Sequence, residues 1–189
     1  MASRAMGIGV VGKPDTTFKR KFRFTFEISG FCNNEKNRVP EHFVKVASRP
    51  NLEVEETEIN FLNATTWEPG KAKWQSINVT YLDVAADTNR FLFNWLATIY
   101  DYTDPVNLRM GKRIDWNATG VLNLYDGCGQ LLEQWQLQRL WPTNVNWGDL
   151  DYSSSDFAEI ELTLRYSDVR YRSYCPDFTP VGCCTPCSL

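Results

Sequence analysis

The sequence has little of what catalytic and metal-binding sites need. Its 189 residues include one histidine, His42, so a Ser-His-Asp or Cys-His arrangement would have to be built on that side chain. No nucleophile motif lies near His42, and the chain has no P-loop and no H-E-x-x-H sequence. We therefore expect no enzymatic activity and no cofactor.

Long apolar runs and an excess of basic residues are also missing. No stretch approaches the roughly 20 apolar residues of a membrane-spanning helix. The apolar residues 6–12 are too few for the apolar region of a secretion signal, so we expect a protein that folds in the cytoplasm and contacts no membrane. A net charge of -3 argues against general nucleic-acid binding, which usually requires a basic balance.

One apparent cofactor motif has the wrong context. Residues 7–12 read G-x-G-x-x-G, but a dinucleotide site needs a strand before this motif and a helix after it. Only six residues precede the motif, and Lys13, Pro14 and Asp15 follow it. We interpret residues 1–17 as a flexible N-terminal arm.

Strand periodicity dominates the rest of the chain and is clearest in residues 120–141. Two alternating segments flank residues 126–129, where Gly127 and Gly129 can take the positive φ of a tight turn. One face of the second segment carries Leu131, Trp135 and Leu137, and the other carries Gln134, Gln136 and Gln138. This pattern predicts an antiparallel hairpin with an apolar face and an uncharged amide face.

The same alternation predicts strands at residues 19–28, 43–47, 52–59, 74–84 and 157–166. Residues 60–72 read as a long connection. After the N-cap candidates Asp87 and Thr88, apolar residues recur at helical spacing until Asp104 and Pro105. The predicted fold class is mainly β, an antiparallel sandwich or barrel with one helix.

Four of the six cysteines lie near the C-terminus, at Cys175, Cys183, Cys184 and Cys187. Cys184 and Cys187 have a zinc-like spacing, but the remaining spacing is irregular. Disulfides and free thiols are the alternatives. We expect three parts: the arm at 1–17, a β domain at 18–172, and a Cys/Pro-rich tail at 173–189.

Taken in order, these elements resemble the tail tube proteins of contractile-tailed bacteriophages. That family is similar in fold to the secreted tube protein of type VI secretion and to the inner tubes of pyocin-like particles. The resemblance covers about residues 18–171. The segments on which the resemblance rests are the strand at 21–27, the segments 43–48 and 52–56, the strand and helix at 74–100, the hairpin within 120–142, and the strand at 160–166.

The resemblance implies a structural protein whose strands complete a barrel shared by six copies in a ring. Rings would stack into a passive conduit for genome ejection, with DNA passing through without specific binding. The other partners would be the tail sheath, baseplate and tail terminator proteins. Such a protein is made in the host cytoplasm and resides in the tail of the virion.

The polar strand faces supply the candidates for the lining of the lumen. These are Ser76, Asn78, Thr80, Gln134, Gln136, Gln138, Glu159 and Glu161. We expect the long connection at 60–72 to contact the next ring through Trp67, Glu68 and Lys71.

Three other functions stay open at this point. The chain could be the inner-tube protein of a type VI-like injection system, or an adaptor at the end of a tube. It could also be a monomeric carbohydrate-binding β module, since seven Trp and eight Tyr residues could stack on sugars.

Overall fold

The computed structural model describes residues 19–31, 37–39, 41–84, 87–102, 111–127 and 129–174. The predictions for the N-terminal arm and for Cys175, Cys183, Cys184 and Cys187 lie outside these residues. Within the described ranges, no helix is long and apolar enough to cross a membrane.

The described elements are mostly strands, together with two α-helices and one 3-10 turn. In chain order these are β1 (Phe24–Ser29), β2 (Arg38–Val39), the 3-10 turn η2 (Glu41–Phe43), β3 (Val44–Ala47), β4 (Leu52–Phe61), β5 (Ala64–Trp74), β6 (Ile77–Leu82), α2 (Asp87–Ile99), α3 (Arg113–Trp116), β7 (Ala118–Tyr125), β8 (Leu131–Asn146), β9 (Glu159–Arg165) and β10 (Asp168–Ser173). The predicted helix is α2, and the four-residue α3 follows it.

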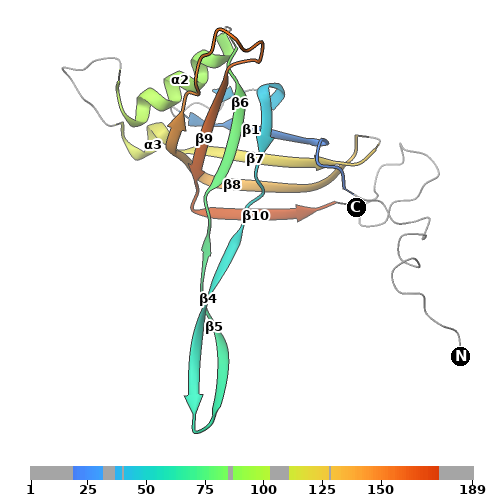
Figure 1. Ribbon diagram of the computed structural model, residues 1–189, viewed down its shortest axis with the longest axis vertical. Helices are drawn as coiled ribbons and strands as arrows, with labels where there is room; N and C mark the ends of the chain where they lie inside the picture. The colour runs from blue at the N-terminus through green and yellow to red at the C-terminus, as the bar shows by residue number, and fades with distance from the viewer. Residues whose placement is uncertain are drawn as a thin grey trace, which may run out of the picture.

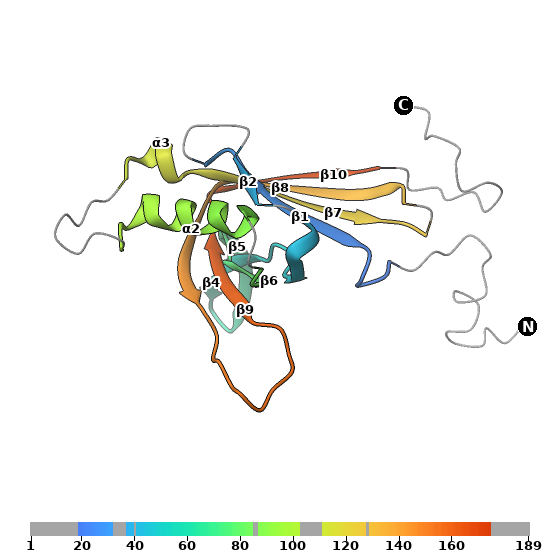
Figure 2. The same ribbon diagram turned by 90° about the horizontal axis from the view of Figure 1, so that it is seen from above.

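Eight of the strands form one antiparallel sheet. Its order is β2-β1-β7-β8-β9-β6-β3, and β10 also pairs with β8. Figure 2 shows that this sheet bends sharply: β1, β7, β8 and β10 form one layer, and β9 and β6 turn away from it. The mainly β, antiparallel fold predicted from the sequence is therefore confirmed.

The bend lies within β8, a strand of 16 residues that changes partners along its length. Its first half pairs with β7 and β10, and its second half pairs with β9. Between the halves, Arg139 has a φ of 56° at a register shift with β7, which is a β-bulge. The strand continues through Pro142, which lies at a second register shift. A bulge tolerates the missing N–H of proline, so our prediction that the strand stops near Trp141 was wrong.

The core fills the angle between the two layers. Alternate residues of β1, β6, β7 and β9 point inward, as the sequence pattern predicted, and α2 covers the core with Leu92, Trp95 and Leu96. The indole Nε1 of Trp95 donates to the backbone oxygen of Trp116 at 2.8 Å, which ties α2 to α3. The buried strand residues include Phe26, Ile28, Leu122, Leu137, Val79, Tyr81, Ile160, Leu162 and Leu164. Burial of each such side chain contributes roughly 1.5–3 kcal/mol.

The largest departure from the sequence prediction is at residues 52–74. We expected a strand followed by a long connection, but β4 and β5 form a separate two-stranded hairpin that projects far from the body (Figure 1). Nearly all of its residues are exposed. Only Trp74, the last residue of β5, packs against the core, so the sequence of the hairpin shows no alternation of buried and exposed positions that would reveal its length. We call it the hairpin arm.

Two further expectations were wrong at the ends of the sheet. Strand β10 follows β9 directly, whereas our last predicted strand ended at residue 166. The first strand was predicted from residue 19, but β1 begins at Phe24, and Phe22, which fits the alternation of the buried face, is 74% exposed.

Candidate assembly surfaces

The outward face of β1, β7, β8 and β10 carries a row of hydrogen-bonded polar side chains. Gln134 Nε2 donates to Asn123 Oδ1 at 3.0 Å, and Asn123 Nδ2 donates to Thr25 Oγ1 at 3.4 Å. The hydroxyl groups of Thr25 and Tyr125 are 3.2 Å apart, and Tyr174 OH donates to Gln134 Oε1 at 3.5 Å. The row crosses the strands, so many of its polar groups bond to each other. We call this surface the polar face.

The glutamines of β8 had suggested an uncharged surface, but the polar face also carries charged side chains. Arg170 lies opposite Gln136, and Arg172 lies opposite Gln134. Both arginines come from β10, which the sequence prediction did not include. In the β1 register, Glu27 is opposite Val121 on the same face. The face therefore combines amides and hydroxyl groups with a few charges of both signs.

The predicted lumen residues fall on two different surfaces. Gln134 and Gln136 lie on the polar face, and Gln138 shares their side of β8. Asn78 and Thr80 lie across from Thr163 and Glu161 on the outer side of β6 and β9; Glu159 shares that side and pairs with Lys45 at 2.5 Å. Ser76 is exposed between β5 and β6. Since the layers enclose one core, the two outer sides turn away from each other and cannot form one lining.

The polar face is bordered by two strand edges. Over Phe24–Glu27, β1 pairs only with β7, and β10 pairs only with β8, among the residues that the structure describes. Tyr174 N–H donates to the Leu132 oxygen at 2.8 Å. Because successive residues of a strand direct their backbone groups to opposite sides, the N–H groups of Val169 and Tyr171 face away from β8. Such edges are templates for pairing with another chain.

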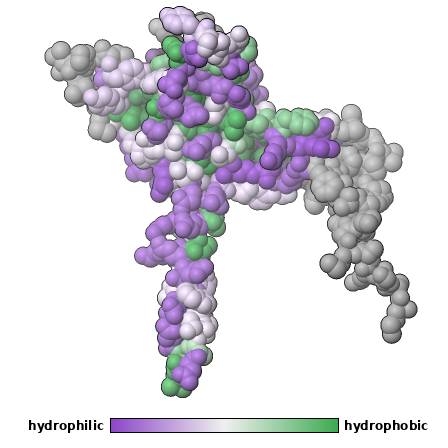
Figure 3. Space-filling view, in the orientation of Figure 1, coloured by the Kyte–Doolittle hydropathy of each residue, from purple (hydrophilic) through white to green (hydrophobic). Residues whose placement is uncertain are grey.

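The hairpin arm has an acidic stem and an apolar tip. Five glutamates and two lysines lie between residues 52 and 74, and Lys73 forms an ion pair with Glu55. The hydrogen bond from Lys73 to Glu55, together with the charge of that carboxylate, raises the pKa of Lys73. The pairing of β4 and β5 shifts register next to Glu55. A Cβ on Gly70 would lie 2.9 Å from the backbone oxygen of Glu55, so the strands need a glycine there. Figure 3 shows apolar side chains at the end of the arm and others partway along it, among mostly hydrophilic ones.

The tip itself is a two-residue turn between Phe61 and Ala64. Leu62 is 91% exposed and has a φ of 53°, a conformation that favours glycine. The three predicted inter-ring residues, Trp67, Glu68 and Lys71, lie on β5 of the arm and are exposed. An exposed apolar residue in a strained position is a feature often associated with function.

A buried carboxylate, Glu133, lies beneath the β10 edge and was missed by sequence reasoning. Lys19 Nζ is 2.5 Å from its Oε2, and Arg49 Nη2 is 3.4 Å from its Oε1. Tyr171 OH donates to Oε2 at 3.4 Å. Burial would raise the pKa of Glu133, but the hydrogen bond and charge of Lys19 and the charge of Arg49 outweigh it and hold the pKa below its usual range. The sequence did contain one sign that Glu133 is buried: in the alternation of β8 it falls on the apolar side, between Leu131 and Trp135.

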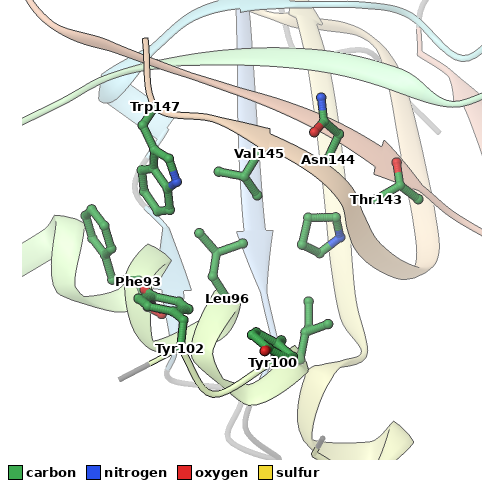
Figure 4. A pocket seen from close by; sticks show the side chains of 10 residues that line it. Phe93, Leu96, Tyr100, Tyr102, Thr143, Asn144, Val145 and Trp147 are labelled. Carbon is green, nitrogen blue, oxygen red and sulfur yellow. The ribbon is translucent and has the colours of Figure 1, made fainter. Parts of the chain in front are cut away.

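An apolar groove of about 590 Å³ separates α2 from the second half of β8 (Figure 4). The rings of Phe93 and Trp147 stack nearly parallel, 4.8 Å apart. Tyr102 OH donates to the Phe93 oxygen at 3.3 Å. Among the residues that the structure describes, the lining contains no charged side chain; its other members are Leu96, Ile99, Tyr100, Pro142, Thr143, Asn144 and Val145. We call it the α2–β8 groove.

The residues considered for catalysis and metal binding are not brought together. His42 packs against Phe43, with ring centres 4.1 Å apart and the ring planes tilted by 51°. In the described ranges, no three His, Cys, Asp or Glu side chains are placed to hold a metal ion. The question of zinc or disulfides in the C-terminal tail is untested, because those cysteines lie outside these ranges.

Solved structures similar to this chain come from contractile injection systems. A chain of an extracellular contractile injection system, from the structure of the PVC sheath-tube complex in the extended state, has a TM-score of 0.62 and 18% identity, covering 83% of this chain and 93% of that one. The tube terminating cap of the anti-feeding prophage has a TM-score of 0.65 and 16% identity, covering 89% and 100%. The PVC sheath/tube terminator has a TM-score of 0.63 and 18% identity, covering 84% and 99%. At these identities the likeness shows the fold.

The sequence comparisons identify the family. A search of curated proteins gives no significant match. The model of the family described as T4-like virus tail tube protein gp19 matches residues 20–170, which include every strand and helix of the described fold except the last three residues of β10. The chain therefore belongs to the T4-like virus tail tube protein family.

Proposed function

We propose that this tail tube protein forms hexameric rings that stack into a conduit for genome ejection. The observation that carries the proposal is the polar face with an open strand edge on each side. Strand β1 runs antiparallel to β7, β7 to β8, and β8 to β10, so β1 and β10 run in opposite directions. When β10 of one copy pairs with β1 of the next, the antiparallel alternation continues from copy to copy.

Closure of a ring pairs both strand edges that border the polar face. Four strands from each of six copies give a barrel of roughly 24 strands, wider than the 16- to 18-stranded barrels that already leave an aqueous channel. Unpaired edges favour aggregation, whereas a closed barrel has none. The charges support the same pairing, since Glu27 of β1 and Arg170 and Arg172 of β10 all lie on the polar face.

The polar face then lines the lumen. Its amide and hydroxyl groups bond to each other across the strands, so few are free to hold a passing phosphate. Arg170 and Arg172 provide weak attraction for DNA, since phosphate contacts are mainly electrostatic and salt-sensitive. Of the predicted lumen residues, Gln134, Gln136 and Gln138 keep this role. Asn78, Thr80, Glu159 and Glu161 belong to the outside of the same assembly, and Ser76 lies next to them.

The hairpin arm contacts the next ring. It leaves the body across the direction of β7, β8 and β10 (Figure 1). Strands in a closed barrel tilt about 35–45° from the axis, so an arm that crosses them extends partly along the tube. Trp67, 59% exposed on β5, is the principal contact, with Glu68 and Lys71 beside it.

The Trp67→Ala variant should form rings that do not stack, while Thr65→Ala should stack normally.

The remaining partners follow from the same role. Similar folds occur in complexes described as sheath-tube, sheath/tube terminator and baseplate structures. A tube of this chain would contact a tail sheath on its outer side, a baseplate at one end and a terminator at the other. It would be assembled in the host cytoplasm and become part of the virion.

Negative-stain electron microscopy of the full chain over a concentration series tests the proposal. Six-fold rings and hollow tubes are expected. Single rings that never stack would indicate a tube-end adaptor, whose fold is similar, and monomers at every concentration would contradict ring closure.

The Tyr171→Pro variant removes an N–H from the open β10 edge and should prevent ring formation. Tyr171→Ala loses the same side chain but keeps that N–H, and should still form rings.

A further inference from the structure

The α2–β8 groove is an apolar surface that the ring interface of the proposed function does not use. Its aromatic side chains remain partly accessible: Tyr100 is 50% exposed, and Tyr102 and Trp147 are each 44% exposed. Burial, with a further contribution from the charge of Asp101, raises the pKa of Tyr102, so its hydroxyl stays neutral at physiological pH. An uncharged, aromatic groove of about 590 Å³ is suited to an apolar chain segment.

The groove and the described ends of the chain lie at opposite ends of β8. Tyr174 N–H bonds to the oxygen of Leu132, and Lys19 pairs with Glu133, so both ends are fixed near the start of that strand. The groove is lined by residues 142–145 near the end of the same strand. In Figures 1 and 2, α2 lies at one end of the molecule, and β10 runs away from it toward the other. In a barrel whose strands run obliquely along the tube, these ends become opposite faces of the ring.

The chemistry of the C-terminal tail fits this groove. Residues 175–189 include Pro176, Phe178, Pro180 and Pro186, and Asp177 is their only charged side chain. Proline-rich segments bind aromatic-lined grooves because their extended backbone is already ordered. A phenylalanine between two prolines supplies the ring that such a groove can bury.

A tail cannot place Phe178 in the groove of its own copy. Phe178 is four residues beyond Tyr174 and reaches at most about 14 Å from it. From Leu132 to Arg139, β8 alone spans roughly 23 Å before it turns toward the groove. The tail of a stacked copy, in contrast, emerges at the ring face that meets the α2 end of the next ring.

From the groove, the tail composition and this distance, we infer that residues 175–189 of one copy bind the α2–β8 groove of a copy in the adjacent ring. The inference rests on the proposed stacking of rings. It gives the tube a second contact between rings, separate from the hairpin arm, and it assigns a role to the tail that does not depend on its cysteines.

Photo-crosslinking in assembled tubes tests the inference. The full chain would carry benzoylphenylalanine in place of Phe178, and tubes would be grown from equal amounts of ¹⁵N-labelled and unlabelled protein. We expect adducts between the tail and peptides containing Val145, Trp147 or Tyr102, with half of them mixed in label because they join different copies. Matched chains would carry the probe at Phe61 or Ile8.

Each outcome has a defined meaning. Adducts within one copy, adducts on another surface, or groove adducts from the Ile8 probe in place of the Phe178 probe would overturn the inference. Tubes without a groove adduct would overturn it and leave the proposed function standing, whereas an absence of tubes by microscopy would reject both.

As a second measurement, Phe178→Asp and Val145→Asp should each raise the concentration needed for tube growth about tenfold, with circular dichroism confirming the fold. Unchanged tube growth in both folded variants would also reject the inference.

Discussion

The side chain of Arg139 forms an ion pair with Asp168, the first residue of β10. Arg139 is also the bulged residue between Gln138 and Leu140, the last two residues of β8 that pair with β7, and it has a φ of 56°. The bend of the sheet and the start of β10 thus meet at one position. This position sets the angle between the polar face and the second layer, and with it the curvature that a subunit brings to the ring.

The positive φ of Arg139 predicts an unusual response to glycine. A left-handed conformation costs an L-residue roughly 1–2 kcal/mol, a cost that glycine avoids. The ion pair with Asp168 is about half exposed on both sides and contributes little. Arg139→Gly should therefore be more stable than Arg139→Ala by about 1 kcal/mol in urea unfolding. At Val121, a regular strand position in β7 between Glu27 and Gln136, the Gly variant should be less stable than the Ala variant, as is usual in strands.

Glu133 should make stability depend on acid pH. Its pKa is held below the usual range in the folded state, so the folded protein stays charged where the unfolded chain begins to bind a proton, near pH 4.3. The stabilisation is complete above that pH and is lost as pH falls through the lower folded-state pKa. Thermal unfolding between pH 7 and pH 3 should show a smaller decrease for Glu133→Gln than for the unmodified chain.

The same Glu133→Gln variant should be less stable by about 1–2 kcal/mol at pH 7, because charged hydrogen bonds are lost at a buried site. The exposed Glu161 is a suitable control, since Glu161→Gln should leave both the pH dependence and the stability nearly unchanged. Parallel pH profiles for Glu133→Gln and the unmodified chain would show that Glu133 is not the group responsible.

Tyr81→Phe should not destabilise the protein. The Tyr81 hydroxyl is fully buried and has no hydrogen-bond partner among the described residues, and burial raises its pKa. A buried polar atom without a partner is unfavourable, so its removal should leave the free energy of unfolding unchanged or raise it by up to about 1 kcal/mol. Tyr81→Ala should lose roughly 3–5 kcal/mol through the cavity it leaves. Chemical denaturation measures both, and a clear loss for Tyr81→Phe would reveal a bonded hydroxyl.

The sequence was most informative where a strand has one buried face. Residues 120–141 alternate cleanly, and the hairpin of β7 and β8, the amide face and the inward Leu137 all follow from that pattern. Glu133 could not be predicted as a buried ion pair, because Lys19 and Arg49 approach it from distant parts of the chain. Strand β10 is short and carries Arg170, Tyr171 and Arg172, so its residues read as a polar ending rather than an edge strand.

The hairpin arm was missed for a different physical reason. The strand predicted at 52–59 corresponds to most of β4, but β5 is exposed along nearly its whole length and shows no hydrophobic alternation, and Gly70 with Pro69 resembled a turn. The pairing of the two strands is fixed locally by the register of β4 and β5. The same lack of burial explains the division among the lumen candidates, because alternation tells which residues point outward but not to which side of a folded sheet.

Leu62 offers a direct test of why the arm has an apolar tip. Because its φ of 53° suits glycine, Leu62→Gly should leave the stability of the protein unchanged or slightly higher. It should nevertheless weaken tube growth if the exposed leucine contacts the next ring. Leu62→Asn, which also tolerates this conformation, should weaken growth similarly, whereas Leu62→Met keeps an apolar side chain and should grow tubes normally. Tube growth followed by light scattering separates the two roles of the residue. If all three variants grow tubes alike, the tip serves only as a turn, and the inter-ring contact must lie lower on the arm, at Trp67.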